Sequence, residues 1–298
     1  MTDTVPGRAD RLAPDLRRVL APNPSPMTWQ GTNTFLLGRG DVAVIDPGPA
    51  LPAHLAAVLA ALDPGERITH ILVTHSHLDH SGLAPALARA TGAPVLAYGP
   101  SDAGRSPAMA ALAAQGALGG GEGVDAAFAP DIRLAHGATV AGESWQVTAL
   151  WTPGHMGNHL CFETAGRILC GDHVMGWSSS FVSPPDGDMG AYMASLDLLA
   201  ARGARVLHPA HGAPVTDPAA RIADLARHRR AREAAILAEL ARGPADLARL
   251  TARIYTDTAP ALHPAAARNV LSHLVDLVDR KQVTASPGPL PAATFRRS

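Results

Sequence analysis

Four short apolar segments of this chain each end in a side chain that can bind a metal ion. The side chains at these ends are His75, His155, Asp172, His208 and His211. Apolar runs such as residues 71–73 are typical of buried β-strands. A fold that gathers the four ends at one rim brings together imidazole and carboxylate groups, which are the ligands that zinc and related cations take. This requirement constrains the fold more than any other feature of the sequence.

The first of these segments carries the densest group of such residues. His75, His77, Asp79 and His80 lie within six positions, and Gly82 follows them. A lone histidine is usually a surface or core residue, but four metal-capable side chains directly after a predicted strand are difficult to obtain by chance. Ligands on a loop that a rigid strand holds suit a reactive metal centre. The motif alone leaves the number of bound ions open.

The composition excludes several classes of protein. Hydrophobic residues make up 47% of the 298 positions, which is typical of a globular chain with a sizeable core. The formal net charge is −1 and Lys281 is the only lysine, so no bulk attraction to nucleic acid or acidic membranes is expected. The first residues lack the order of a signal peptide, and no apolar run approaches the ~18 residues of a membrane span. We expect a soluble cytoplasmic protein.

Strand and helix patterns alternate between about residues 30 and 213. The expected strands are 34–37, 42–45, 71–75, 94–98, 145–151, 160–164, 167–171 and 205–207. The expected helices among them are 51–62, 83–91 and 191–201. This alternation predicts an α/β core. Residues 1–28 are polar and rich in proline, and we expect them to form a loosely held lead-in.

After Pro214 the pattern becomes almost entirely helical. Helices are expected at 217–242, at 247–254 and at 265–281, where apolar residues recur at helical spacing. We therefore expect two domains, residues 1–216 and residues 217–298, of which the second is a small winged-helix-like unit. The arginine-rich residues 227–230, with Arg232, are interpreted as a solvated helix face rather than as a phosphate-binding patch.

The two cysteines flank a predicted hairpin. Cys161 and Cys170 stand on either side of a turn at Ala165-Gly166, which makes them neighbours on adjacent strands. In a cytoplasmic protein we expect reduced and buried thiols rather than a disulfide.

Taken together, the motifs resemble those of the metallo-β-lactamase-fold hydrolases. The HxHxDH motif of that family matches residues 75–80, its TPGH motif matches 152–155, its GD motif matches 171–172 and its late HG motif matches 211–212. Asp46-Pro47-Gly48 resembles the early aspartate turn of the family. The tail resembles the extension of the branch known as beta-lactamase-like protein 2. The resemblance implies an αββα sandwich followed by a winged-helix-like domain.

The resemblance also implies a dinuclear metal site. It assigns His75, His77 and His155 to one zinc ion, Asp79, His80 and His211 to the second, and Asp172 to a bridge between them. Asp79 would also orient the metal-bridging hydroxide that attacks the substrate, and Asp46 is a candidate partner of a ligand histidine. His208 matches no ligand position, and His159 and His173 are interpreted as packing or surface residues. Iron or manganese in place of zinc is left open.

The substrate is less constrained than the site. Zinc β-lactamases with a cysteine in the second site place it where this chain has Asp172, so antibiotic hydrolysis is not expected as the main role. Our leading hypothesis is hydrolysis of a small-molecule ester or thioester. Trp29, Trp177 and Phe181 are candidates for lining the pocket. A non-catalytic binding role is disfavoured by the complete ligand set.

Two other activities are retained as alternatives. The branch resemblance implies cleavage of single-stranded RNA, against which stand the near-neutral charge and an aromatic content of 4%. Iron-dependent oxidation of persulfides or reduction of oxygen is the third hypothesis, because some family members use the same ligands for iron. A small-molecule substrate is therefore expected, RNA is an alternative partner, no membrane partner is expected, and homo-oligomer formation is left open.

Overall fold

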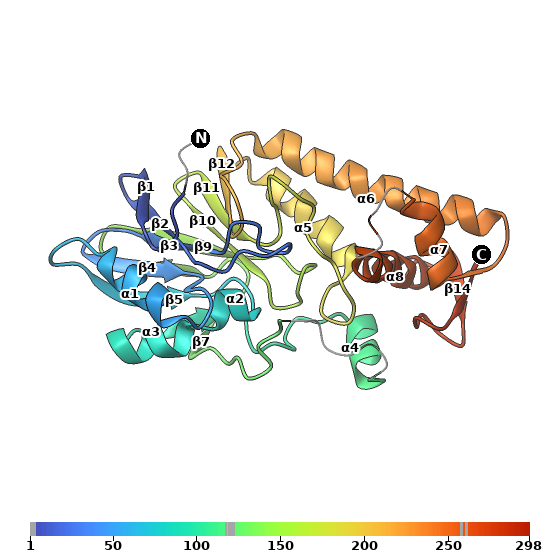
Figure 1. The fold of residues 1–298 in the computed structure, drawn as a ribbon, viewed down its shortest axis with the longest axis horizontal. Coiled ribbons are helices and arrows are strands. Elements are labelled where there is room, and N and C mark those ends of the chain that lie inside the picture. Colours follow the sequence, from blue (N-terminus) through green and yellow to red (C-terminus); the bar gives the residue numbers. More distant parts are fainter. Residues whose placement is uncertain (1–3, 117, 119–122, 257–258, 260–261) are drawn as a thin grey trace.

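The two larger sheets pack face to face and are covered by helices on their outer sides (Figure 1). The computed structural model describes all residues except 1–3, 117, 119–122, 257–258 and 260–261. In the described part of the chain, the first sheet has the order β1 (Ala9–Ala13), β2 (Leu16–Leu20), β3 (Asn33–Leu37), β4 (Asp41–Ile45), β5 (Arg67–Leu72), β6 (Val95–Ala97) and β7 (Ile132–Arg133). The second has the order β12 (Val206–Pro209), β11 (Arg167–Gly171), β10 (Leu160–Thr164), β9 (Gln146–Trp151) and β8 (Thr139–Ala141).

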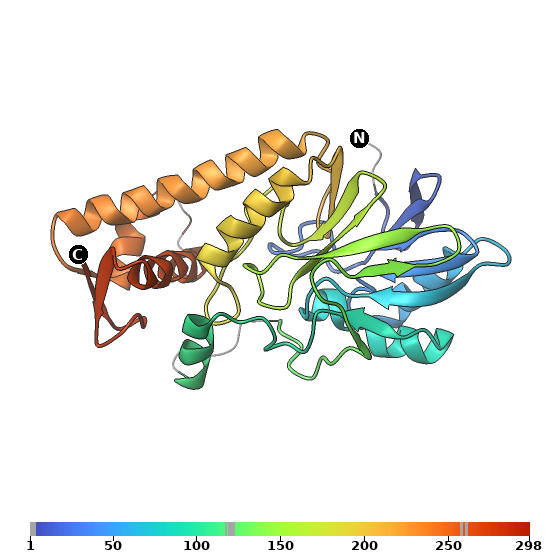
Figure 2. The same cartoon turned by 180° about the vertical axis from the view of Figure 1, so that it is seen from behind.

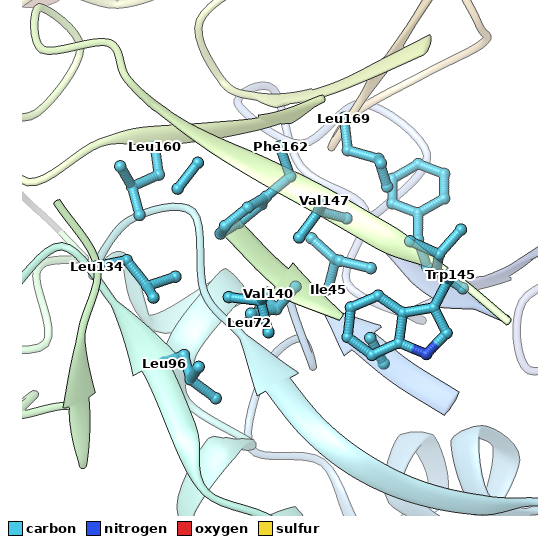
Figure 3. Packing of buried hydrophobic residues seen from close by; sticks show 14 of the residues in the cluster. Ile45, Leu72, Leu96, Leu134, Val140, Trp145, Val147, Leu160, Phe162 and Leu169 are labelled. Carbon is cyan, nitrogen blue, oxygen red and sulfur yellow. The ribbon is translucent and has the colours of Figure 1, made fainter. Parts of the chain in front are cut away.

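Alternating side chains on the strands build a core on each face of the first sheet. Phe35 and Leu37 of β3 belong to the cluster between the two sheets, together with Phe162 and Leu169. Figure 3 shows Phe162 and Leu169 in this cluster, near Ile45 and Val147. Leu36, between them in the sequence, belongs to the cluster on the opposite face. Successive side chains of a strand point to opposite faces, and each fully buried one contributes roughly 1.5–3 kcal/mol. The apolar strand sequences therefore require a layer on both sides.

Helices supply the two outer layers. Val58 of α1 (Pro52–Ala60) and Leu87 of α3 (Ala84–Thr91) cover the first sheet. Tyr192 and Leu196 of α5 (Met189–Ala201) cover the second. The side chain of Asp188 caps α5 by accepting a hydrogen bond from the backbone of Ala191. The resulting αββα sandwich is the predicted fold.

The C-terminal residues form a smaller unit with its own core. It contains α6 (Pro218–Ala241), β13 (Ala245–Asp246), α7 (Leu247–Ile254), α8 (His263–Asp279), β14 (Val283–Ser286) and β15 (Thr294–Arg297). In the described residues, its strands pair in the order β13-β15-β14, which adds a wing to the helices. Leu250, Leu274 and Phe295 are fully buried in its core, to which α4 (Pro107–Ala114) also contributes.

Helix α6 belongs to both parts of the molecule. Ile222 and Leu225 in its first half pack in the cluster that contains α5, whereas Ile236 and Leu240 near its end pack in the C-terminal core. The view from behind shows α6 running beside α5 and on to the C-terminal unit (Figure 2). The division at residues 216 and 217 stays a prediction, because one long helix crosses directly from one core to the other.

The expectation of a loose lead-in was wrong. Residues 9–20 form β1 and β2, and all five residues of β2 are buried. The sequence appeared polar because β2 carries Arg17 and Arg18, whose charges are paired inside the fold. Arg17 contacts Glu66 at 2.6 Å and Arg18 contacts Asp10 at 2.9 Å. Paired charges can be buried next to apolar neighbours, and composition alone does not reveal the pairing.

The cysteine prediction is confirmed. Cys161 and Cys170 are both free and buried. Cys161 precedes Phe162 and Cys170 follows Leu169, and these two neighbours pair in the β10–β11 hairpin. Burial raises the pKa of the Cys161 thiol to about 12, which makes it inert as a nucleophile.

None of the helices in the described part of the chain combines the length and apolar character needed to cross a bilayer.

Candidate metal centre

The seven side chains of the predicted site come from five separate segments and meet at the ends of strands. His75 and His77 follow β5, Asp79 and His80 lie on the short helix α2 (Leu78–Ser81), and the other three follow β9, β11 and β12. They form two groups, in each of which the candidate ligand atoms lie within 4.8 Å of one another. The groups are His75, His77, His155 and Asp172, and Asp79, His80 and His211.

Asp172 reaches both groups. Its Oδ2 atom lies 3.6 Å from Nε2 of His155 in the first group and 3.6 Å from Nε2 of His80 in the second. Its Oδ1 atom lies 3.3 Å from Nε2 of His211. A carboxylate in this position can contact two cations at once.

The chemistry of the donor atoms fits bound cations. Nε2 of His75 and Nε2 of His155 lie 2.8 and 3.1 Å from the same atom, Nδ1 of His77. Nε2 of His80 and Oδ1 of Asp172 are buried without a hydrogen-bond partner in the described structure. Buried polar atoms normally have partners, and converging imidazole nitrogens with carboxylates are the donors that zinc, iron or manganese take. The residues present therefore fit a pair of divalent metal ions.

Asp46 and Thr74 orient two of the histidines. The backbone of Asp46 has a φ angle of 51°, and its carboxylate accepts hydrogen bonds from Nδ1 of His80 at 2.9 Å and from the Thr74 hydroxyl at 2.8 Å. Because the Thr74 hydroxyl proton is donated to Asp46, its oxygen can accept from Nδ1 of His75, at 3.0 Å. Each contact leaves Nε2 of the histidine directed at the centre, which is how outer partners tune metal ligands.

Backbone carbonyls orient two more histidines. Nδ1 of His155 donates to the carbonyl oxygen of Phe181 at 2.6 Å, and Nδ1 of His211 donates to that of Gly31 at 3.1 Å. The hydroxyl of Thr32 donates to Oδ2 of Asp79 at 3.0 Å. Except for Asp46, sequence reasoning found none of these partners. Backbone carbonyls carry no side-chain signal, and the partner residues are distant in sequence from the ligands.

The histidines of the centre fall into two kinds, those whose pKa is lowered and those whose pKa is raised. Burial holds the pKa of His75 well below its usual range and lowers that of His77 to about 3. Burial opposes protonation of His211 too, but Asp172 and Asp79 raise its pKa to about 10. Burial likewise acts on His80, whose pKa is raised well above its usual range by Asp79, Asp172 and Asp46. In the metal-free protein, the carboxylates therefore favour the protonated forms of His80 and His211, at positions that cations would occupy.

The remaining histidines near the site stay outside both groups. His208 is buried edge-on against Phe35, with ring centroids 5.8 Å apart, and burial lowers its pKa to about 4. His159 lies under His75, with ring centroids 5.2 Å apart, and His173 packs on Tyr192 at 4.6 Å. The interpretation of His159 and His173 as packing residues agrees with this placement.

Two exposed tryptophans lie at the outer edge of the candidate metal centre, which we call the rim. Trp29 and Trp177 are 45% and 37% exposed, and their ring centroids lie 5.5 Å apart. A Cβ atom at Gly212, the residue after His211, would approach Trp177 to 2.9 Å and Trp29 to 3.1 Å. The indoles thus lie directly against the strand end that carries His211. Phe181, the third predicted pocket residue, acts in the described contacts through its carbonyl oxygen.

Comparison with known families agrees with this geometry. The profile described as Metallo-beta-lactamase superfamily matches residues 27–211, more than half of the chain and the whole span of the seven site residues. The chain belongs to the metallo-beta-lactamase superfamily. A second profile, Beta-lactamase associated winged helix domain, matches residues 247–288. The winged-helix character predicted for the tail is therefore confirmed.

The chain is also similar to individual proteins of this superfamily. It is 33% identical over 237 residues to the lactamase-like protein nscB of Neosartorya fischeri, covering 75% of this chain and 61% of that protein. It is 34% identical over 236 residues to the atrochrysone carboxyl ACP thioesterase of Aspergillus chevalieri, covering 77% and 67%. The chain thus spans about six tenths of the length of nscB. A solved metallo-beta-lactamase family protein of Thermus thermophilus matches with 26% identity and a TM-score of 0.76, covering 97% of this chain and all of that one.

Proposed function

We propose that this chain is a metal-dependent hydrolase that holds two zinc ions and cleaves a small-molecule thioester. The observation that carries the proposal is the meeting of two groups of metal-capable side chains at Asp172, which contacts both. The thioester is favoured over the ester by the relative named as an acyl-carrier-protein thioesterase. In the proposed assignment His75, His77 and His155 hold one ion, Asp79, His80 and His211 hold the second, and Asp172 bridges them.

Bound cations at these positions would acidify a water molecule and polarise the carbonyl group of the substrate. The residues of the chain supply binding and orientation. Asp46, Thr74 and the carbonyl of Phe181 keep the imidazoles turned towards the centre. Burial raises the pKa of Asp79, but His80 and His211 outweigh it and hold that pKa well below its usual range, so Asp79 is ionised at neutral pH.

Asp79 is the proposed catalytic residue. Thr32 donates to its Oδ2 atom, which fixes the direction of the carboxylate. Asp79 would orient the water whose oxygen adds to the carbonyl carbon. When the carbon–sulfur bond breaks, a proton of that water would pass to the departing sulfur. The products are a carboxylic acid and a thiol, which balances the reaction R–CO–S–R′ plus water.

The local charges support a small molecule more than RNA. Arg221 and Arg229, which contact the loop that follows Asp172, are occupied by backbone carbonyls. A nucleic-acid site needs free cations to contact successive phosphates. The exposed indoles Trp29 and Trp177 suit an apolar acyl group at the rim.

The proposal is tested by metal analysis and a substrate panel on the same preparation. Purified full-length chain should hold about two equivalents of zinc and hydrolyse acyl thioesters, and chelation should remove both properties. The variants His77→Ala and Asp79→Asn should lose turnover by at least about a hundredfold. Iron with persulfide turnover, or RNA cleavage without thioester turnover, would overturn the thioesterase assignment.

A further inference from the structure

The loop that follows Asp172 is held in place by helix α6. Residues 172–188 contain neither helix nor strand and connect β11 to α5. Arg221 of α6 donates from Nε to the carbonyl of Met175 at 2.7 Å and from Nη2 to that of Ser178 at 2.6 Å. Arg229, two turns further along α6, donates from Nη2 to the carbonyl of Ser180. Two arginines of one helix thus bind three carbonyls of one loop.

Arg229 is buried in a way that packing alone does not explain. Its exposed fraction is 2%, and no carboxylate of the described residues lies within ion-pair distance of it. Its partners are Ser180, the Oδ1 atom of Asn269 at 3.3 Å and the ring of Tyr192, whose centroid lies 5.2 Å away. A buried charge without a counter-ion is costly, and an apolar side chain would fill the space at less cost. An apolar side chain, however, could not make the hydrogen bond that Arg229 donates to the loop.

These hydrogen bonds lie on both sides of a residue that contacts the metal centre. Ser180 precedes Phe181, whose carbonyl accepts the Nδ1 proton of His155 at 2.6 Å. Val182 follows Phe181, and its backbone N–H points to Oδ1 of Asn269 at 3.4 Å. Arg229 therefore fixes the peptide group that precedes the Phe181 carbonyl, and Asn269 fixes the peptide group that contains it.

The position of Arg229 also corrects the interpretation of residues 227–230 as a uniformly solvated face. Arg227 is exposed and pairs with Asp224 on the same helix at 2.6 Å. Arg229 points instead towards the loop, and Arg232 lies over Tyr255 and donates to the carbonyl of Ile254. Successive arginines of a helix point in different directions, so a cluster in the sequence need not form one patch.

We propose that Arg229 is a positioning residue of the metal centre. Through Ser180 and the carbonyl of Phe181 it sets the orientation of His155, while Arg221 anchors the earlier part of the same loop. Helix α6, which continues into the winged-helix unit, is by this route a structural part of the active site. The inference depends on the proposed function only in taking His155 as a metal ligand.

The test compares Arg229→Met, Arg229→Lys and Arg227→Met in the full-length chain. Zinc affinity is measured by competition with a chromophoric chelator, together with thermal unfolding of the metal-free protein and separate kcat and KM values. In Arg229→Met one of the two zinc ions should bind about tenfold more weakly or worse, while the other changes less than about twofold. Arg229→Lys should restore part of the affinity, and Arg227→Met should behave as the parent.

An unchanged pair of zinc affinities in folded Arg229→Met, even with a lower melting temperature, would show that Arg229 only packs and would overturn the proposal. If Arg229→Met does not fold, Arg229→Lys decides, because it keeps the buried positive charge and removes the guanidinium that contacts Ser180 and Asn269. Arg229→Lys should bind the same single ion more weakly than the parent, and parental affinity for both ions in that variant overturns the proposal. If the parent binds zinc but cleaves no thioester, the proposed function fails, and the affinity comparison still decides the role of Arg229.

Discussion

Asp46 accepts a hydrogen bond from Nδ1 of His80 at 2.9 Å, although the two residues are 34 positions apart. The backbone of Asp46 has a φ of 51°, a region that residues other than glycine rarely adopt. The strain is offset by three contacts, which include the backbone N–H of Thr74 at 2.7 Å. The turn after β4 is therefore shaped to direct one carboxylate at His80 and Thr74, which lie next to the metal centre.

The contact between Asp46 and His80 predicts the effect of Asp46→Asn. Asparagine tolerates the left-handed backbone of this turn but lacks the negative charge that stabilises the orientation and basicity of His80. We expect one zinc ion to bind roughly tenfold to a hundredfold more weakly, with the fold retained. Zinc affinity by chelator competition and circular dichroism check this. The exposed Asp102→Asn serves as the control, and equal affinities in the two variants would contradict the prediction.

The sequence predicted the architecture because strands and helices depend on local patterns. The seven candidate ligands were implied by the family resemblance, and the structure brings their side chains together in two groups. Apolar runs showed the strands, and residues 75–80 carry their ligand types in one stretch. What could not be predicted were contacts made through space by the backbone or by buried charges. The carbonyls of Gly31 and Phe181, the buried pair Arg17–Glu66 and the inward turn of Arg229 belong to this class. Hydropathy assigns a charged residue to the surface unless its partner is known.

Metal removal should make the stability of the chain depend on pH in the neutral range. In the metal-free protein the pKa of His211 is raised to about 10 and that of His80 is also raised. The stability that these protons give is fully present below about pH 6.5 and is lost as pH rises towards the folded pKa values. Zinc needs neutral imidazoles, so its affinity should rise over the same range.

The measurement is thermal unfolding of chelated protein with and without added zinc at pH 6.5, 7.5 and 8.5. The gain in melting temperature on adding zinc should increase with pH, because fewer protons remain to be displaced. A gain that is constant or falls with pH would contradict protonation of His80 and His211 in the metal-free protein.

His273 predicts a second pH effect far from neutral. It is buried in α8, both ring nitrogens lack a hydrogen-bond partner in the described structure, and burial lowers its pKa to about 3. Because the folded pKa is depressed, the neutral form stabilises the fold above about pH 6.5, and this stability is lost as pH falls towards the folded value. At about 1.4 kcal/mol per pKa unit, the loss at pH 4.5 is about 3 kcal/mol.

The variant His273→Leu should therefore be more resistant to acid than the parent chain. Urea unfolding at pH 7 and pH 4.5 measures the effect, and the difference in free energy of unfolding between the two pH values should shrink by up to about 3 kcal/mol. His136→Gln, at an exposed histidine, is the control. The same pH dependence in His273→Leu and parent would show that His273 does not titrate in the unfolding transition.

The indole pair at the rim predicts a selective change in substrate binding. Trp29 and Trp177 lie against Gly212, next to the candidate ligand His211, so an acyl group whose carbonyl is at the metal centre extends towards them. Removing one indole by Trp177→Ala should raise KM for a thioester with an aromatic acyl group about twofold to tenfold, since such contacts contribute roughly 0.5–1.5 kcal/mol. Turnover at saturation should change little, because the indole does not contact the reacting atoms. An acetyl thioester, too short to reach the rim, should be hydrolysed as by the parent, and Ile132→Ala, at another exposed apolar residue, should change neither. Equal losses for the acetyl and aromatic thioesters would mean that Trp177 supports the loop and not the substrate.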